Sequence, residues 1–199
     1  MIVIYCILAL LAVLVAILLL NTAIQTRKAR TLAGQHPNFT EEELQGYATA
    51  AQEMLRCKTI SVKGSYDDTE FAKLRQAVKE QFPLLHEKAE FTICADDCWV
   101  YKIPGKDSSR SIALMSHHDV VAANEEWTYE PFSGTVVDGN IYGRGAADTK
   151  GSLCAILWAA EKMLEEGFQP AVNVYILSSH NEELGGDGML RLHRGRPPP

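Results

Sequence analysis

The first twenty residues constrain this chain more than any other segment. Met1 to Leu20 contain no charged side chain, and as an α-helix they would measure about 30 Å, the thickness of a bilayer's hydrocarbon core. A cleaved signal peptide has a basic start and a shorter apolar core, but no Lys or Arg precedes this run. We therefore expect a retained single-pass membrane anchor over residues 1–20, followed by a polar tether over residues 21–39.

Charge and cysteine content set further expectations. Arg27, Lys28 and Arg30 follow the apolar run, and the positive-inside rule then places the rest of the chain in the cytoplasm. The net charge of -6 argues against a nucleic-acid partner, because phosphate binding needs clustered Lys and Arg. The five scattered cysteines do not suggest a disulfide framework. Cys94 and Cys98 are interpreted as neighbours on a hairpin, since no second pair follows to complete a zinc knuckle.

The remaining sequence, residues 40–199, predicts one α/β domain. Apolar residues at helical spacing predict helices over residues 40–55, 69–82 and 150–166, the first opening with a Thr40-x-x-Glu43 capping box. Apolar, β-branched and aromatic runs predict strands over residues 91–93, 99–103, 111–116 and 172–177, with Pro104-Gly105 as the turn of the first pair. Alternating strands and helices predict a three-layer sheet with helices on both faces and ligands at the strand ends.

The segment Ser116-His117-His118-Asp119 follows directly on one of these strands. His117 and Asp119 face the same side of an extended chain, because side chains alternate with a period of two. A zinc-bound histidine usually donates its other N–H to a carboxylate, and Asp119 is placed for that role. Taken alone, the pair is more typical of a strand-end histidine beside a solvated acid. His118 is interpreted as a non-ligand.

Two acidic motifs follow further along the chain. Asp148 stands in a glycine-rich turn before a predicted helix, where it is either the helix N-cap or a carboxylate shared by two cations about 3.5–4 Å apart. Glu182 and Glu183 follow the last predicted strand. Adjacent acids point apart, so one can bind a metal while the other acts as general base; the alternative is a solvated acidic turn. No G-x-S-x-G elbow is present, which leaves a serine hydrolase as a remote alternative.

Taken in order, these motifs resemble those of the zinc aminoacylase and carboxypeptidase family. The segments are Ser-His-His-Asp-Val-Val, Ile-Tyr-Gly-Arg-Gly-x-x-Asp-x-Lys and Asn-Glu-Glu-x-Gly-Gly. The family includes carboxypeptidase S, aminoacylase, acetylornithine deacetylase and succinyl-diaminopimelate desuccinylase. The resemblance covers residues 48–188, and the anchor followed by this domain looks most like the carboxypeptidase S branch.

The resemblance implies a hydrolase that uses two zinc ions to cleave an amide or peptide bond next to a free carboxylate. His117 would bind the first zinc, Glu183 the second, and Asp148 would bridge both. Asp119 would orient His117, and Glu182 would be the general base that moves a proton from water to the leaving amine. The implied substrate is a small peptide or an N-acyl amino acid.

The resemblance also implies parts that this sequence does not supply. The family adds a further acidic ligand, a late histidine and a lid or dimerisation domain after the Glu pair. We therefore expect an N-terminal half of a catalytic domain, with three of five zinc ligands and little or no turnover by itself. The alternative is a truncated or degenerate, non-catalytic product that acts only with a partner. Asn181 also stands where the family usually has Asp.

Overall fold

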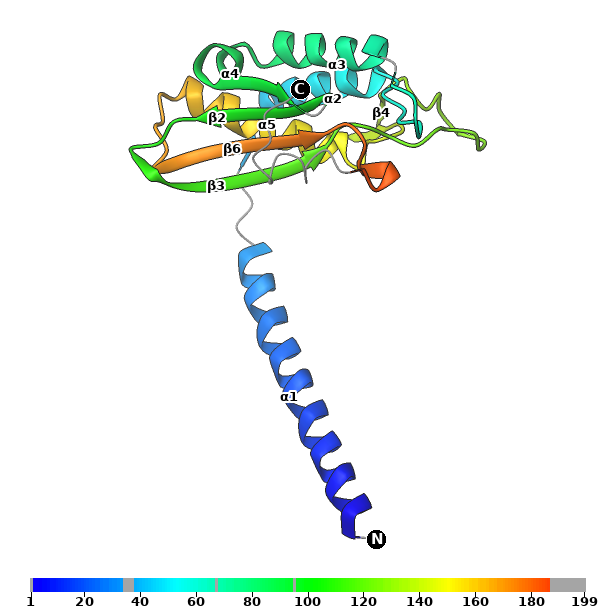
Figure 1. Cartoon of the computed structure of the whole chain (residues 1–199), viewed down its shortest axis with the longest axis vertical. Coiled ribbons are helices and arrows are strands. Elements are labelled where there is room, and N and C mark those ends of the chain that lie inside the picture. Colours follow the sequence, from blue (N-terminus) through cyan, green and yellow to red (C-terminus); the bar gives the residue numbers. More distant parts are fainter. Residues whose placement is uncertain (1, 34–37, 67, 95, 187–199) are drawn as a thin grey trace. The chain divides into compact units, whose positions relative to one another are not determined.

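The structure is a computed structural model that describes residues 2–33, 38–66, 68–94 and 96–186 (Figure 1). The chain forms two compact units, Met1–Thr40 and Glu41–Pro199. The first unit contains one helix, α1 (Ile2–Ala33), within its described residues. The second unit contains the elements that carry the sequence motifs.

Helix α1 contains a stretch, Ile4–Arg27, that is long and apolar enough to cross a membrane. Helices of this kind near an N-terminus occur both as membrane anchors and as signal sequences. The helix does not stop at Leu20 but continues to Ala33, so most of the range expected to be a tether is helical. The physical reason is that neither Gly nor Pro interrupts the chain before Gly34.

The second unit mixes helices and strands in the order α2, α3, α4, β1, β2, β3, β4, β5, α5, β6 and the 3₁₀ turn η1. The helices are α2 (Glu41–Arg56), α3 (Asp68–Gln81), α4 (Pro83–Lys88) and α5 (Lys150–Glu165). The strands are β1 (Glu90–Cys94), β2 (Cys98–Ile103), β3 (Asp107–His117), β4 (Thr135–Val137), β5 (Asn140–Tyr142) and β6 (Val172–Ser179), and η1 covers Glu182–Leu184.

The main sheet has the strand order β1-β2-β6-β3. Strands β3 and β6 are parallel and are joined through α5, whereas β2 pairs antiparallel with both β1 and β6. His117 at the end of β3 lies opposite Ser179 at the end of β6. Because the carboxyl ends of parallel neighbours meet at one edge, the motifs that follow these two strands are brought together there.

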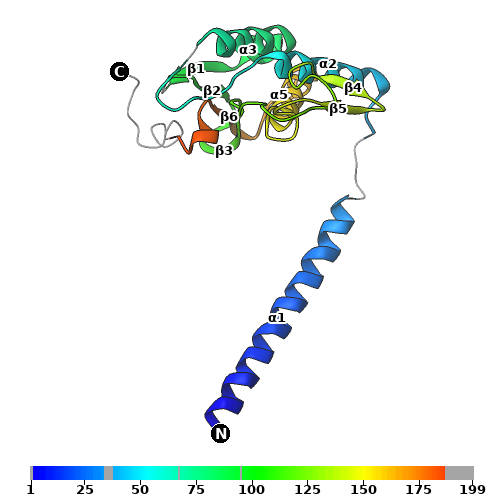
Figure 2. The ribbon, with the colours of Figure 1, turned by 90° about the vertical axis from the view of Figure 1, so that its right-hand side faces the viewer.

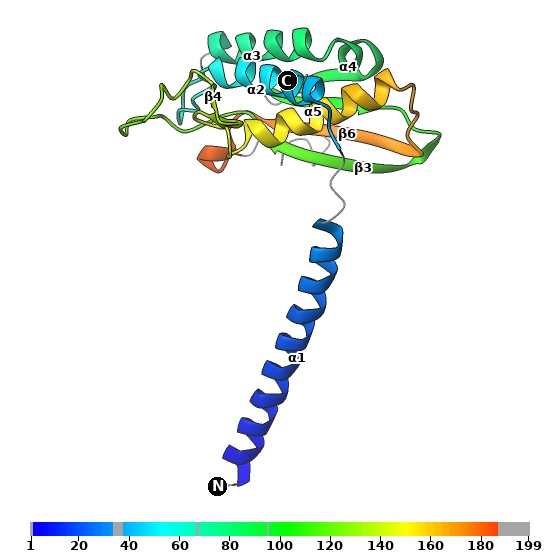
Figure 3. The ribbon, with the colours of Figure 1, turned by 180° about the vertical axis from the view of Figure 1, so that it is seen from behind.

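One apolar core joins the sheet to its helices. Trp99, Tyr101 and Ile103 of β2 and Val174 and Ile176 of β6 are buried in the same cluster as residues of α2, α3, α4 and α5. These strand residues alternate along the chain, so they all point to one face of the sheet. Figure 1 shows the strands in front of α5, and Figure 3 shows α2 and α5 in front of the strands.

The prediction of helices on both faces is therefore wrong for the described residues, which place their helices on one face (Figure 2). On the opposite face, Val100 and Leu177 are only half-buried and Met115 is 61% exposed. The sequence predicts a buried strand over residues 172–177, but in β6 only the alternate residues Val174 and Ile176 belong to the core under the helices. The mixed α/β class itself is confirmed.

Most predicted elements are found within a few residues of their expected bounds. The inward stripes Phe71-Leu74-Val78 of α3 and Leu153-Leu157-Ala160 of α5 are buried as expected. The assignment of the first turn is wrong. Pro104-Gly105 follows β2 rather than joining it to β1, because β1 ends at Cys94 and β2 already begins at Cys98. The prediction relied on Pro104-Gly105 because this dipeptide is typical of turns. A loop of two or three residues without it is enough to connect a hairpin.

Two further elements were not expected from the sequence. The hairpin β4-β5 turns through Asp138 and Gly139, both of which have positive φ angles, as a type I′ turn requires. Helix α4 begins at Pro83, which ends α3 but also occupies the first turn of the new helix. The predicted stop was correct, but a proline can open a helix as well as close one.

Helix α4 obtains its N-terminal cap from another helix. No side chain of its own caps it, and Glu161 of α5 accepts hydrogen bonds from the amides of Leu84 (2.9 Å) and Leu85 (2.7 Å). The Glu161 carboxylate is only 4% exposed and lies at the positive end of the helix dipole. This contact fixes α4 to α5.

We expect Glu161→Ala to lower the free energy of unfolding by about 1–3 kcal/mol, because two buried amides lose their acceptor. Glu161→Gln, which keeps one carbonyl oxygen, should lose less. Glu165→Ala is the matched control: this side chain is 42% exposed on the same helix, so the change should cost under about 0.5 kcal/mol. Urea unfolding followed by circular dichroism measures all three, and equal losses for Glu161→Ala and Glu165→Ala would contradict the capping role.

Candidate metal centre

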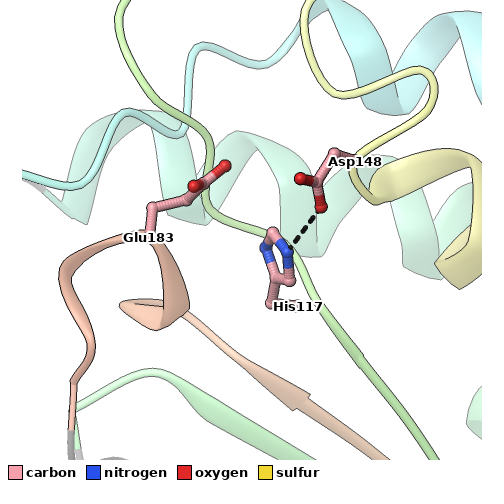
Figure 4. A group of neighbouring side chains, drawn as sticks. All are labelled: His117, Asp148 and Glu183. Atoms are coloured by element: carbon pink, nitrogen blue, oxygen red, sulfur yellow. Dashed lines mark hydrogen bonds and ion pairs between the residues drawn. The ribbon is translucent and has the colours of Figure 1, made fainter.

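Three separate chain segments converge at the carboxyl edge of β3 and β6 (Figure 4). His117 is the last residue of β3, Asp148 lies in the turn before α5, and Glu183 belongs to η1. One donor atom from each of these three residues lies within 4.8 Å of the other two. The structure therefore brings together the three residues expected to bind metal, although they lie far apart in the sequence.

The closest contact in this group joins the imidazole to the aspartate. His117 Nε2 lies 3.1 Å from Asp148 Oδ1. Glu182 also approaches the ring, with its Oε2 atom 3.6 Å from His117 Nε2. Both members of the Glu pair therefore approach the cluster. Glu182 lies near the imidazole, and Glu183 lies near both the imidazole and Asp148.

Asp119 supports the cluster through its contacts with His117 and with the Glu pair. Its carboxylate is fully buried, with Oδ1 3.3 Å from His117 Nδ1, and its backbone oxygen lies 3.1 Å from the same nitrogen. The same carboxylate accepts hydrogen bonds from the amides of Glu182 and Glu183, each at 3.1 Å. Asp119 thus holds both the histidine ring and the turn that carries the two acids.

The electrostatics of the cluster reflect an excess of negative charge. Burial would lower the pKa of His117, but Asp119 and Asp148 outweigh it and raise that pKa to about 9. Burial and the nearby Asp148 charge raise the pKa of Glu183. Burial opposes the ionisation of Asp119, yet its hydrogen bonds to His117 and to the two amides lower its pKa. A cation is therefore favoured at the centre of this group.

Asp148 is not the N-cap of α5. The cap position is held by Thr149, and the Asp148 side chain is 80% exposed toward the cluster edge. The peptide bond between these two residues is cis. Of the two roles that the sequence allowed for Asp148, capping is therefore excluded by the position of the helix start.

Lys150 lies two residues after Asp148 and is only 1% exposed. Its Nζ atom donates hydrogen bonds to the carbonyl oxygens of Met54 (3.2 Å) and Cys57 (2.6 Å), where α2 ends. Burial lowers the pKa of Lys150 to about 8. The ammonium satisfies carbonyls that a helix end leaves unpaired and so fixes the Asp148 turn against α2. Lys150 is the last residue of the Ile-Tyr-Gly-Arg-Gly-x-x-Asp-x-Lys motif, but the sequence alone did not assign it a role.

His118 faces the opposite side of the chain from His117. Its ring is fully buried, stacks on Trp99 at 4.0 Å and contacts Ser178 Oγ at 2.8 Å. Its Nε2 atom lies 3.7 Å from the buried Asp97 carboxylate, which forms an ion pair with Arg75 at 2.7 Å. His118 is therefore a core residue, and it anchors the segment that carries His117.

The donor set fits a zinc ion. Zinc binds imidazole nitrogen and carboxylate oxygen at about 2.0–2.2 Å, so two ligands of one ion lie at most about 4.4 Å apart. The 3.1 Å separation of His117 and Asp148 falls inside this limit, and the 4.8 Å bound on the whole group requires only small side-chain rotations. The second nitrogen of His117 is already held by Asp119, as in many zinc sites.

Comparison with known proteins agrees with this geometry. Residues 113–197 match the model of Peptidase family M20/M25/M40. Residues 113–197 carry part of an M20 peptidase domain. This confirms the resemblance inferred from the motifs, and a divalent metal is implied by the family.

Two curated relatives of this M20 domain illustrate the likeness. "Probable carboxypeptidase S-like 2" of Dictyostelium discoideum is 40% identical over 137 residues, covering 65% of this chain and 26% of that protein. The mouse "N-fatty-acyl-amino acid synthase/hydrolase PM20D1" is 32% identical over 172 residues, covering 84% of this chain and 34% of that protein. The chain thus spans about a quarter to a third of the length of these two relatives.

Solved structures agree on the fold. An M20 family metallo-carboxypeptidase from Sulfolobus solfataricus superposes with a TM-score of 0.60 and 27% identity, over 79% of this chain and 36% of that one. Human carnosine dipeptidase 1 superposes with a TM-score of 0.58 and 21% identity, over 78% of this chain and 37% of that one. The latter supports the fold alone.

The pKa of His117 leads to a test of the metal-free M20 domain. The folded-state value of about 9 exceeds the ordinary value of 6.5, so the stabilisation from the protonated ring is complete below about pH 6.5 and is lost as the pH rises through 9. In the presence of a chelator we expect the free energy of unfolding to fall by about 3 kcal/mol across this window. Urea titrations at several pH values measure it.

His117→Gln should remove most of this pH dependence, because no ring remains to titrate between the two acids. His86→Gln is the control, since burial lowers the pKa of His86 and the residue lies outside the cluster. A pH profile that His117→Gln leaves unchanged would show that the ring is not the titrating group.

Proposed function

We propose that this chain is the N-terminal part of a membrane-anchored, zinc-dependent hydrolase of amide or peptide bonds. The observation that carries the proposal is the convergence of His117, Asp148 and Glu183 within 4.8 Å at the carboxyl edge of the sheet. The match to the M20 family and the hydrolase names of its relatives support the same reaction class. We propose that α1 anchors the chain and that Arg27, Lys28 and Arg30 keep the domain on the cytoplasmic side.

We assign His117 to a first zinc, Glu183 to a second, and Asp148 to both. Two zinc ions at such a site would lower the pKa of a shared water and polarise the scissile carbonyl. With metal bound, Asp119 would keep the proton of His117 on Nδ1, so that the lone pair of Nε2 would be available to the ion that Asp148 shares. The two amide hydrogen bonds to Asp119 keep that carboxylate ionised, which favours this tautomer.

Glu182 is assigned as the general base. Its side chain is 59% exposed, so substrate and water can reach it, while its backbone is held by Asp119. The carboxylate takes up a proton from the attacking water and delivers it to the leaving amine. Glu183 is held by the second oxygen of the same aspartate. One buried carboxylate thus sets the spacing between base and ligand.

The proposed substrates are small peptides or N-acyl amino acids. The named relatives include a probable carboxypeptidase and an N-fatty-acyl-amino acid synthase/hydrolase. Both names imply substrates with an amide bond next to an amino acid carboxylate. Within the described residues, the cluster offers three ligands for two ions. Because a catalytic zinc usually has three protein ligands, we propose that this chain by itself turns over little or no substrate.

We predict that the purified full-length chain binds zinc and that Asp148→Asn removes most of the bound metal, since one carboxylate serves both ions. Glu182→Gln should retain the metal, because the base does not hold it. Glu87→Gln, a change at an exposed acid outside the cluster, is the control and should bind like wild type. Dialysis followed by elemental analysis gives the zinc content. Metal loss in Glu182→Gln with retention in Asp148→Asn would reverse the assignment.

A second prediction concerns turnover. With zinc added, we expect the 199-residue chain to hydrolyse N-acetyl amino acids and dipeptides at a rate close to that of buffer, because the cluster offers three ligands for two ions among the described residues. Amine release measured with a fluorogenic reagent detects the reaction. Robust hydrolysis that a chelator abolishes would contradict the proposed shortage of ligands, and would do so while supporting the reaction class.

A further inference from the structure

A second buried carboxylate lies close to the segment that carries the metal centre. Asp97, which directly precedes β2, is fully buried. It is not one of the three residues of the metal cluster. Moving a carboxylate out of water is costly unless charged or hydrogen-bonded partners compensate for it. The partners of Asp97 therefore indicate what this charge does.

Two donors hold one oxygen of this carboxylate. Asp97 Oδ1 accepts a hydrogen bond from the indole of Trp99 (3.0 Å) and forms an ion pair with the guanidinium of Arg75 (2.7 Å). Burial would raise the pKa of Asp97, but its neighbours, first of all His118, outweigh burial and lower that pKa. The carboxylate is therefore ionised at neutral pH.

The other oxygen of Asp97 faces the ring of His118. Asp97 Oδ2 lies 3.7 Å from His118 Nε2, and neither atom has a hydrogen-bond partner among the described residues. This separation exceeds that of a hydrogen bond, but both atoms are buried, so water screens their attraction little. The carboxylate thus favours a proton on Nε2, which leaves Nδ1 to accept the hydroxyl of Ser178 at 2.8 Å.

His118 is held on its other sides as well. Its ring stacks on Trp99 with 4.0 Å between the ring centroids and meets Phe71 edge-on at 5.8 Å. Its backbone N–H donates to the carbonyl of Ser179 (2.9 Å), and its carbonyl accepts from the hydroxyl of Thr59 (2.5 Å). Within this packing, the contact with Asp97 is the one that depends on a buried charge.

The position of His118 bears on the metal centre because the preceding residue is His117. Successive side chains of an extended chain point to opposite sides, so one stretch of backbone directs both rings. Each ring faces a buried aspartate, Asp119 for His117 and Asp97 for His118. With His118 fixed in the core, the ring of His117 is directed toward Asp148, whose Oδ1 atom lies 3.1 Å from His117 Nε2.

We propose that Asp97 is a positioning residue of the metal centre and that it sets the orientation of His117 through His118. The inference rests on the proposed function, in which His117 binds zinc, and it adds a second buried carboxylate to the residues that determine zinc affinity. Without the charge of Asp97, the orientation of the His118 ring is no longer specified. The ring of His117 is then less well directed, and zinc binds more weakly.

The first test replaces the charge and keeps the shape. Asp97→Asn retains an oxygen that can accept from Trp99, and in the full chain in lipid nanodiscs we expect it to raise the Kd for zinc about tenfold. Losing a residue that supports a metal ligand typically costs 10–100-fold in affinity. Competition with a chromophoric chelator measures this Kd. Asp68→Asn is the matched control: Asp68 also pairs with Arg75 but is 60% exposed, so Kd should change less than twofold.

A double-mutant cycle distinguishes positioning from a general loss of stability. His118→Phe keeps a ring that can stack on Trp99 but offers no nitrogen to Asp97. If Asp97 acts through His118, the double variant should bind zinc no more weakly than the weaker single variant, whereas independent effects would multiply. Glu161→Ala removes the cap of α4 and tests stability alone, so it should leave the zinc Kd within twofold.

Arg75→Gln reaches the same carboxylate from helix α3. The Arg75 side chain is 23% exposed, so this variant keeps the test possible if Asp97→Asn does not fold. It removes the cation that pairs with Asp97 and should raise the zinc Kd severalfold. In a His118→Phe background it should have no further effect.

A second measurement follows His117 without zinc. His117 is 7% exposed, so a reagent reaches its ring mainly when the ring moves. With a chelator present, mass spectrometry gives the rate at which diethyl pyrocarbonate modifies His117. We expect Asp97→Asn to raise this rate at least threefold and Asp68→Asn to leave it unchanged.

The outcomes separate this inference from the proposed function. If the wild-type chain binds no zinc but Asp97→Asn raises the modification rate, the metal assignment fails and the positioning role stands. If zinc binds but neither its Kd nor the modification rate responds to Asp97→Asn, the positioning role is overturned and the metal centre stands. Effects that multiply in the double variant, or an equal effect of Asp68→Asn, would also overturn the positioning role.

Discussion

The buried carboxylate of Asp119 is the contact on which the rest of the site depends. It pairs with His117, the last residue of β3, and accepts hydrogen bonds from both amides of the Glu pair that follows β6. A fully buried charge is tolerated only when its hydrogen bonds are satisfied, so the two strand ends are bound to one another by this requirement. Without it, the imidazole and the two acids would sit on independent loops.

The remaining proposed ligand, Asp148, is positioned by a different contact. Asp148 lies on an exposed turn, but two residues later the buried Lys150 ammonium is hydrogen-bonded to carbonyls at the end of α2. A desolvated ammonium without acceptors would be costly, so this contact fixes where the turn lies. The site thus combines exposed reactive groups with buried charged supports, and the supports rather than the ligands specify the geometry.

Much of the fold and of the candidate site could be predicted from local patterns. Periodicity located α3, α5, β2 and β6, and the motif order located His117, Asp148 and Glu183 before any distance was known. The misses have two causes. Helix α4 depends on a cap from Glu161, which cannot be predicted without knowing that α4 and α5 are neighbours. The β1-β2 turn is local, and it was assigned to a turn dipeptide that follows β2 instead.

The sequence by itself determined the residue types at the site, the apolar first helix and the elements whose side chains repeat at a regular period, because these depend on residues within a few positions of one another. Only the tertiary structure decided that helices pack on one face of the described sheet, that Lys150 and His118 are buried supports, and that Asp97 faces the ring of His118. Strand order and register determine these features, and both are set by pairing between segments tens of residues apart.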